Sequence, residues 1–155
     1  MATAGLADQP DPDNPGWLVW GQKDLVRFNS HVFGKLSVRR DDDGRARLRM
    51  MPQNHHTNLV GTVHGGALLS LADVAVFAIP YLLGHAVRSG AVTLDLTMQF
   101  LAPAQVGSAC DAVGEVLKET GRLVFVRGLL EQGEVRVAAF SGTLRKLSDS
   151  PGQRR

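Results

Sequence analysis

Cysteine, net charge and recognisable metal- or phosphate-binding motifs are all scarce in this sequence. The single cysteine, Cys110, excludes an intrachain disulfide framework and is typical of a protein in the reducing cytoplasm. A formal net charge of +2 is too small to argue for nucleic acid as a partner. Zinc-ligand spacings and phosphate-binding glycine loops do not occur. We therefore expect a cytoplasmic protein that needs no metal, no cofactor and no nucleic acid.

The ends of the sequence also lack apolar stretches. Residues 1–17 are rich in proline and aspartate, so they do not predict a signal peptide. We expect a flexible arm over residues 1–20, a single domain over 21–147 and a polar tail over 148–155. The apolar run 67–83 falls short of the roughly 20 residues of a membrane helix and contains an acid, so it predicts a core helix and no membrane contact.

Alternation of apolar and polar residues predicts a largely antiparallel sheet. Strands at 33–40 and 45–51 are expected to form a hairpin, because the turn between them ends in Gly44. A short helix or turn is expected just before this hairpin, at 24–29. The second half of the sequence contains four alternating segments, which predict a meander with strands at 92–101, 109–118, 123–131 and 135–145.

One acid dominates the middle of the chain. Asp73 is the only formally charged residue between Gly61 and Val87, and its neighbours are almost all small or apolar. An ionised carboxylate in apolar surroundings is destabilising unless it is paired, hydrogen-bonded or protonated. Asp73 is therefore the first functional candidate, and the alternative is a structural acid satisfied by a partner chain or a backbone amide.

His64-Gly65-Gly66 precedes this acid. A helix is predicted from about Gly66 to Leu82, with Pro80 kinking its last turn and a glycine as its stop. The first N–H groups of a helix lack intrahelical partners and lie at the positive end of its dipole, which suits an anion or a carbonyl oxygen. The alternative is that the two glycines only cap a buried helix.

This helix is apolar all round, so it must be covered on all sides. A single curved sheet wrapped around it would bury one side, and a second subunit would bury the rest. The sequence alone thus predicts an α+β fold in which one long central helix lies inside a curved antiparallel sheet.

The run from Asn58 through His64-Gly65-Gly66 to Asp73 resembles the hot-dog-fold acyl-CoA thioesterases of the phenylacetic-acid-degradation (PaaI-like) group. Residues 92–103, with their closing apolar-small-Pro, are similar to the strand that follows the helix in that family. The resemblance implies a hot-dog fold and hydrolysis of an acyl-CoA or aryl-CoA thioester. It also implies homodimers, commonly paired into tetramers, and no metal.

The resemblance also implies catalytic roles. The Gly65 N–H would donate to the thioester oxygen, and Asp73 would act as general base on water or as nucleophile. Asn58 and His64 would position the thioester or the water. Thr93 would hold the attacking water beside Asp73.

Four further residues are candidates for substrate binding: Gly66, Ser70, Phe77 and Tyr81. For the two aromatic residues, core packing is the alternative. Asp73 lies eight residues beyond Gly65, which is about 12 Å along a helix. A short side chain cannot span that distance, so we expect a homodimer whose two active sites each combine Gly65 of one chain with Asp73 of the other.

Two other functions stay open at this stage. A hot-dog dehydratase or hydratase would use the same fold, although the Gly-Gly after His64 favours a thioesterase. A non-catalytic acyl-CoA-binding or regulatory module would bind the ligand without turnover, and fold alone does not separate it from an enzyme.

Overall fold

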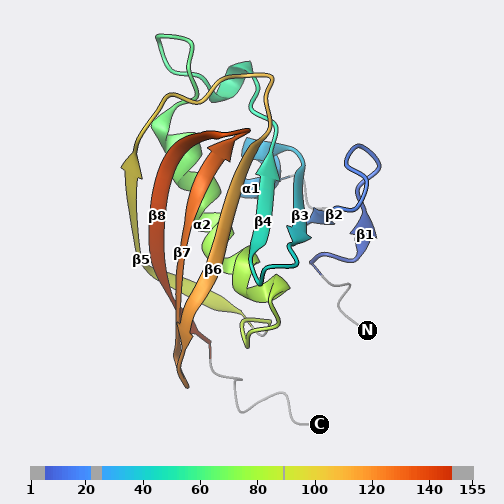
Figure 1. The fold of residues 1–155 in the computed structure, drawn as a ribbon, viewed down its shortest axis with the longest axis vertical. Helices are drawn as coiled ribbons and strands as arrows, with labels where there is room; N and C mark the ends of the chain where they lie inside the picture. Colours follow the sequence, from blue (N-terminus) through green and yellow to red (C-terminus); the bar gives the residue numbers. More distant parts are fainter. Residues whose placement is uncertain (1–5, 22–25, 89, 148–155) are drawn as a thin grey trace.

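The computed structural model describes residues 6–21, 26–88 and 90–147, and in them one long helix lies inside a curved antiparallel sheet (Figure 1). The strand order across the sheet is β1-β2-β3-β4-β6-β7-β8-β5. The elements of the first half are β1 (Gln9–Pro10), β2 (Leu18–Trp20), α1 (Phe28–Phe33), β3 (Leu36–Arg40), β4 (Ala46–Met50), the 3-10 turn η1 (Asn54–His56) and α2 (Gly65–Leu82). The elements of the second half are β5 (Ala91–Phe100), β6 (Cys110–Glu119), β7 (Leu123–Gln132) and β8 (Val135–Lys146).

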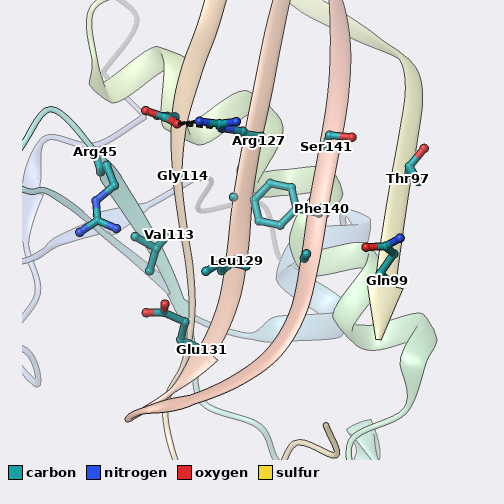
Figure 2. Close-up of a pocket in the computed structure, with 13 residues that line it drawn as sticks. Arg45, Thr97, Gln99, Val113, Gly114, Arg127, Leu129, Glu131, Phe140 and Ser141 are labelled. Atoms are coloured by element: carbon teal, nitrogen blue, oxygen red, sulfur yellow. Dashed lines mark hydrogen bonds and ion pairs between the residues drawn. The ribbon is translucent and has the colours of Figure 1, made fainter. Parts of the chain in front are cut away.

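The face of the sheet turned away from α2 carries a shallow hollow of about 520 Å³ over β6, β7 and β8 (Figure 2). Val113, Leu129 and Ala139 line it. At its rim the Arg127 guanidinium donates to the Glu115 carboxylate at 2.8 Å. None of the residues predicted to form the active site lines this hollow.

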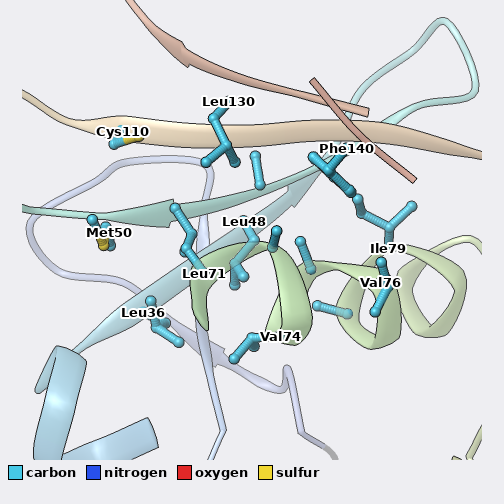
Figure 3. Close-up of a cluster of buried hydrophobic side chains, with 14 of the residues drawn as sticks. Leu36, Leu48, Met50, Leu71, Val74, Val76, Ile79, Cys110, Leu130 and Phe140 are labelled. Atoms are coloured by element: carbon cyan, nitrogen blue, oxygen red, sulfur yellow. The ribbon is translucent and has the colours of Figure 1, made fainter. Parts of the chain in front are cut away.

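The other face of the sheet packs on α2 and forms the core (Figure 3). Ten of the 18 residues of α2 are buried, although by length and composition alone the helix is apolar enough to cross a membrane. Fully buried side chains from β4 and β7, such as Leu48 and Leu130, belong to one hydrophobic cluster with Leu71 and Ile79 of the helix. A core helix, as the sequence predicts, is therefore what the fold contains.

Glycines in the sheet let the helix approach closely. A Cβ placed on Gly114 of β6 would lie 2.7 Å from the Ile79 side chain, and one on Gly142 of β8 would lie 2.9 Å from Val76. Such distances are shorter than any real contact, so these positions have no room for a side chain. The helix ends at Leu82, with Pro80 in its last turn, and Gly84 follows two residues later with a φ of 88°, a conformation that suits glycine.

The predicted elements match the structure with three corrections. The helix and the four long strands are confirmed to within two residues at each end. The four strands are not a simple meander, because β5 pairs with β8 while β6 pairs with β4. The hairpin strand predicted from Phe33 begins at Leu36, because Phe33 ends helix α1. The helix predicted at 24–29 begins only at Phe28, and residues 24–25 lie outside the described residues.

The flexible arm predicted over residues 1–20 is corrected for residues 6–20. Strand β2 pairs with β3, placing Trp20 opposite Leu36, and β1 pairs with β2. Trp17 is buried beneath the guanidinium groups of Arg39 and Arg49, whose central carbons lie 4.8 and 4.0 Å from the ring centre. This segment belongs to the sheet, whereas residues 1–5 and the tail at 148–155 lie outside the described residues.

A buried carboxylate fastens this segment to the sheet. The Asp11 side chain is fully buried and accepts hydrogen bonds from Lys35 Nζ at 2.7 Å, from the Asn14 side chain at 2.7 Å and from the Ser37 hydroxyl. Burial alone would raise the pKa of Asp11, but these bonds outweigh it and hold the pKa well below its ordinary value of 3.8. The carboxylate is therefore charged and fully partnered at neutral pH.

We expect Asp11→Asn to lower the free energy of unfolding at pH 7 by about 1.5–3 kcal/mol, the range for hydrogen bonds to a charged group. Because the pKa of Asp11 is lower in the folded state, its contribution to stability is fully present above about pH 4, near the pKa of the unfolded carboxyl. This contribution is lost as the pH falls from there through the folded-state pKa. Urea unfolding at several pH values measures this. The gap between wild type and variant should shrink toward acid, and a gap independent of pH would contradict the charge-based account.

Candidate active site

Asp73 faces outward from α2 on the side that the sheet leaves open. The side chains flanking it in sequence, Ala72 and Val74, are buried, but Asp73 itself is exposed in the single chain. The prediction of a carboxylate enclosed by apolar side chains is therefore wrong for one chain, because the helix turns its apolar neighbours toward the sheet. The Thr93 hydroxyl on β5 donates a hydrogen bond to Asp73 Oδ1 at 2.9 Å, so the predicted pair is brought together.

A β-bulge in β5 aims Thr93 at the helix. Thr93 lies opposite Leu144 of β8, but Asp95 lies opposite Thr143, so Leu94 is an extra residue in the strand. Before the bulge the odd-numbered Thr93 faces α2, and after it the even-numbered Leu96 does so, opposite Gly142. A polar hydroxyl and an apolar side chain therefore meet the same helix from one strand.

Asp73 and Thr93 line a cleft of about 530 Å³. The rest of its lining combines apolar side chains of α2, β2 and β5 with the polar residues Arg27, Asn29 and Ser30 at the start of α1. Phe77 lines the cleft. Tyr81 does not, because it is buried against Trp20 with ring centres 5.3 Å apart, and its hydroxyl oxygen accepts the Leu6 N–H at 3.1 Å. Its assignment to substrate binding is corrected to core packing.

The start of α2 is capped by a histidine ring. His64 Nδ1 accepts a hydrogen bond from the Gly66 N–H at 2.8 Å, so the ring has its proton on the other nitrogen and serves as the N-cap. A Cβ on Gly66 would lie 2.9 Å from that Nδ1, which explains the second glycine. The Gly65 N–H has no acceptor among the described residues, and the Phe100 ring lies against the position of a Gly65 Cβ at 3.3 Å.

Two other predicted residues use their polar groups inside the fold. The Asn58 side-chain oxygen accepts the N–H groups of Val60 and Thr62 at 3.1 and 3.2 Å, and its amide donates to the Thr62 hydroxyl at 2.9 Å. The Ser70 hydroxyl donates to the Gly66 carbonyl at 2.8 Å. In the single chain both residues shape the backbone around the helix start.

The predicted residues thus fall into two groups within one chain. Asp73, Thr93 and Phe77 share the cleft, whereas His64, Gly66 and Ser70 border a separate hollow of about 390 Å³. Gly65 lies at the start of the helix, about 12 Å from Asp73 along the axis.

The sequence analysis missed the cleft residues that precede β3. Trp20 and Leu6 line the cleft beside Phe28 of α1. No local pattern marks them, because they lie in or beside a polar, proline-rich stretch that predicts a flexible arm. The lone Cys110 is fully buried on β6, and burial together with the nearby Asp111 charge raises the pKa of its thiol to about 12. Cys110 therefore packs inside the sheet.

These features define a hot-dog protein with an acid on its central helix, and comparison with known proteins agrees. Residues 60–139 match the family model of the thioesterase superfamily. Human acyl-coenzyme A thioesterase 13 is 30% identical over 101 residues, which is 64% of this chain and 70% of that protein.

Among solved structures, a mutant form of the phenylacetic acid degradation protein PaaI from Thermus thermophilus is 29% identical, with a TM-score of 0.64 over 77% of this chain and 98% of that one. The E. coli PaaI protein, 23% identical, shares the fold, with a TM-score of 0.68 over 81% and 88% of the two chains. The chain therefore belongs to the thioesterase superfamily, in its PaaI-like hot-dog group.

The histidine cap predicts an unusual sign change. Gly66→Ala should lower the stability of the wild type by about 1 kcal/mol, the value of a helix cap, because the new Cβ evicts the His64 ring. In a His64→Ala background the same change should be neutral or slightly stabilising, since alanine is the better helix former. Thermal unfolding of the four proteins in this double-mutant cycle measures it, and equal losses in both backgrounds would contradict the role of the ring.

Proposed function

We propose that this protein hydrolyses an acyl- or aryl-CoA thioester to the free acid and CoA, with Asp73 at the centre of the reaction. The observation that carries the proposal is the Thr93–Asp73 hydrogen bond in a cleft of about 530 Å³ that is lined in part by apolar side chains. Kinship with an acyl-coenzyme A thioesterase supports a CoA thioester as the substrate. The apolar side chains in the cleft suit the acyl group, and the carboxylate suits the chemistry at its carbonyl.

The chemistry needs one acid and one hydrogen-bond donor. As a general base, Asp73 would take a proton from water while the water oxygen attacks the thioester carbonyl carbon, after which the C–S bond breaks and CoA leaves as the thiol. As a nucleophile, Asp73 would attack that carbon itself, and water would hydrolyse the resulting anhydride. In both forms the Thr93 hydroxyl orients Asp73, and the lone pairs of its oxygen can hold a water beside it.

A donor for the developing oxyanion is available at the start of α2. The Gly65 N–H has no acceptor among the described residues and lies at the positive end of the helix dipole. His64 supports this donor indirectly, because its ring caps the neighbouring N–H of Gly66. Because Gly65 and Asp73 of one chain are about 12 Å apart, they cannot act on the same carbonyl.

We therefore propose that the enzyme is a homodimer in which Gly65 of one chain and Asp73 of the other form each site. Strand β5 supports this arrangement, because it is the last strand of the sheet and no described strand pairs with its outer edge. Unpaired strand edges invite pairing with a second chain. Leu94 and Phe100 of β5, followed by Leu101, expose more than half of their surface, which a partner would cover.

We expect Asp73→Asn to lower kcat for CoA thioesters by about 10²–10⁴-fold, which is the usual contribution of a general base, while folding and substrate binding persist. The asparagine oxygen can still accept the Thr93 hydroxyl. Thiol release from phenylacetyl-, hydroxybenzoyl-, short- and long-acyl-CoA measures turnover. Asp42→Asn, in the exposed β3–β4 turn, is the matched control and should keep full activity.

Full activity in Asp73→Asn would refute the role of this acid. Ligand binding by the wild type without turnover on any substrate would instead indicate the non-catalytic binding module.

Mixed dimers test whether the sites are shared. Gly65→Pro removes the proposed donor at a position where proline is tolerated, since the preceding His64 is extended. We expect its kcat to lie about 10²–10³-fold below that of Gly65→Ala, which carries the same Cβ but keeps the N–H.

Refolding Gly65→Pro together with Asp73→Asn should then restore activity. In a two-fold dimer with shared sites, half of the dimers are mixed and each has one intact site, giving about a quarter of wild-type activity. Activity no higher than that of the two variants refolded separately would place both groups in one chain and overturn the shared site.

A further inference from the structure

The cleft at Asp73 is closed on one side by residues that precede the matched family region. Trp20 and Leu6 line it, whereas the match to the thioesterase superfamily begins at residue 60. These walls therefore come from a part of the chain that the family model does not describe. Their position relative to Asp73 indicates what they do.

Trp20 lines the same cleft as Asp73 and contacts α2 at residues that follow Asp73 in the helix. Its ring packs against Phe77 with centres 6.1 Å apart and against Tyr81 with centres 5.3 Å apart. Along α2 these two residues lie about 6 and 12 Å beyond Asp73. An acyl group whose carbonyl is held at Asp73 and which runs along the helix therefore meets the indole of Trp20 after a short distance.

The wall is held in place by bonds at several points. The Leu6 N–H donates to the Tyr81 hydroxyl oxygen at 3.1 Å, and the Leu6 carbonyl accepts the Gly21 N–H at 2.9 Å. Between them, the buried Asp11 carboxylate binds Lys35 and Ser37 of the neighbouring part of the sheet. Trp20 itself is only 8% exposed. A wall fixed in this way can set a size limit.

We propose that the segment 6–21 forms the end wall of the acyl cleft, and that Trp20 and Leu6 set the longest acyl group that the enzyme accepts. This rests on the proposed function, since it assigns the cleft to the acyl part of the thioester. The side chains of the wall exclude longer acyl groups by occupying the space that those groups would need. Each additional methylene that can be buried raises the affinity about fourfold.

The test is the acyl-length profile of kcat/KM over a series of saturated acyl-CoAs from acetyl to palmitoyl. Trp20→Ala should move the optimum to longer chains by at least two methylenes and raise kcat/KM for the longer ones by more than about tenfold. Phe140→Leu truncates another buried aromatic residue, on the core side of β8, and should leave the optimum where it is. A folded Trp20→Ala protein with the wild-type profile would overturn the proposal.

A second variant keeps the test decisive if Trp20→Ala does not fold. Leu6→Phe adds volume to the same wall while its backbone bonds to Tyr81 and Gly21 remain possible, and it should move the optimum to shorter chains. An unchanged optimum in this folded variant would also overturn the proposal.

Binding measurements separate this proposal from the proposed function. In the Asp73→Asn background, calorimetric titration with the same acyl-CoAs reports the length preference without turnover. If the wild type hydrolyses none of the thioesters but Trp20→Ala still shifts the binding preference, hydrolysis fails and the wall stands. If the length preference in binding is the same for Asp73→Asn with and without Trp20→Ala, or if no acyl-CoA binds, the wall proposal fails as well.

Discussion

Burial of helix α2 against the curved sheet is the constraint on which the rest of the structure depends. Small residues in the middle of β6 and β8, such as Gly114 and Gly142, let the sheet close on the helix at van der Waals distance. The sheet covers only one side of the helix, so the other side is where polar groups can stand. Asp73 occupies that open side, and the cleft beside it exists because α1, β2 and β5 border the same helix face.

The start of helix α2 combines a stabilising cap with a hydrogen-bond donor for the candidate site. The ring of His64 caps the helix, and this cap requires glycine at position 66. With the cap on Gly66, the N–H of Gly65 keeps no partner among the described residues. An N–H group without a partner at the positive end of a helix is costly unless a ligand or water accepts its hydrogen bond. An oxyanion donor must be free in this way, because its hydrogen bond goes to the substrate oxygen.

The segment before β3 shows how a polar, proline-rich stretch becomes part of a fold. It contributes no long apolar run of its own, and its order comes from Asp11 and Trp17, which bond to and stack on residues of β3 and β4. Once fixed, it delivers Trp20 to the cleft. A neighbouring segment with little intrinsic structure thereby shapes one wall of the cleft beside Asp73.

The local pattern of the sequence determined the elements and the central acid of this protein. Periodicity located α2 and the four long strands, and the absence of any other charge between Gly61 and Val87 singled out Asp73, because both signals are read from neighbouring residues. Only the tertiary structure decided that β5 lies beside β8, that a bulge at Leu94 turns Thr93 to Asp73, and that Trp20 lies in the cleft. Strand pairing, bulges and the order of a proline-rich segment depend on contacts between residues far apart in the chain, which local alternation does not encode.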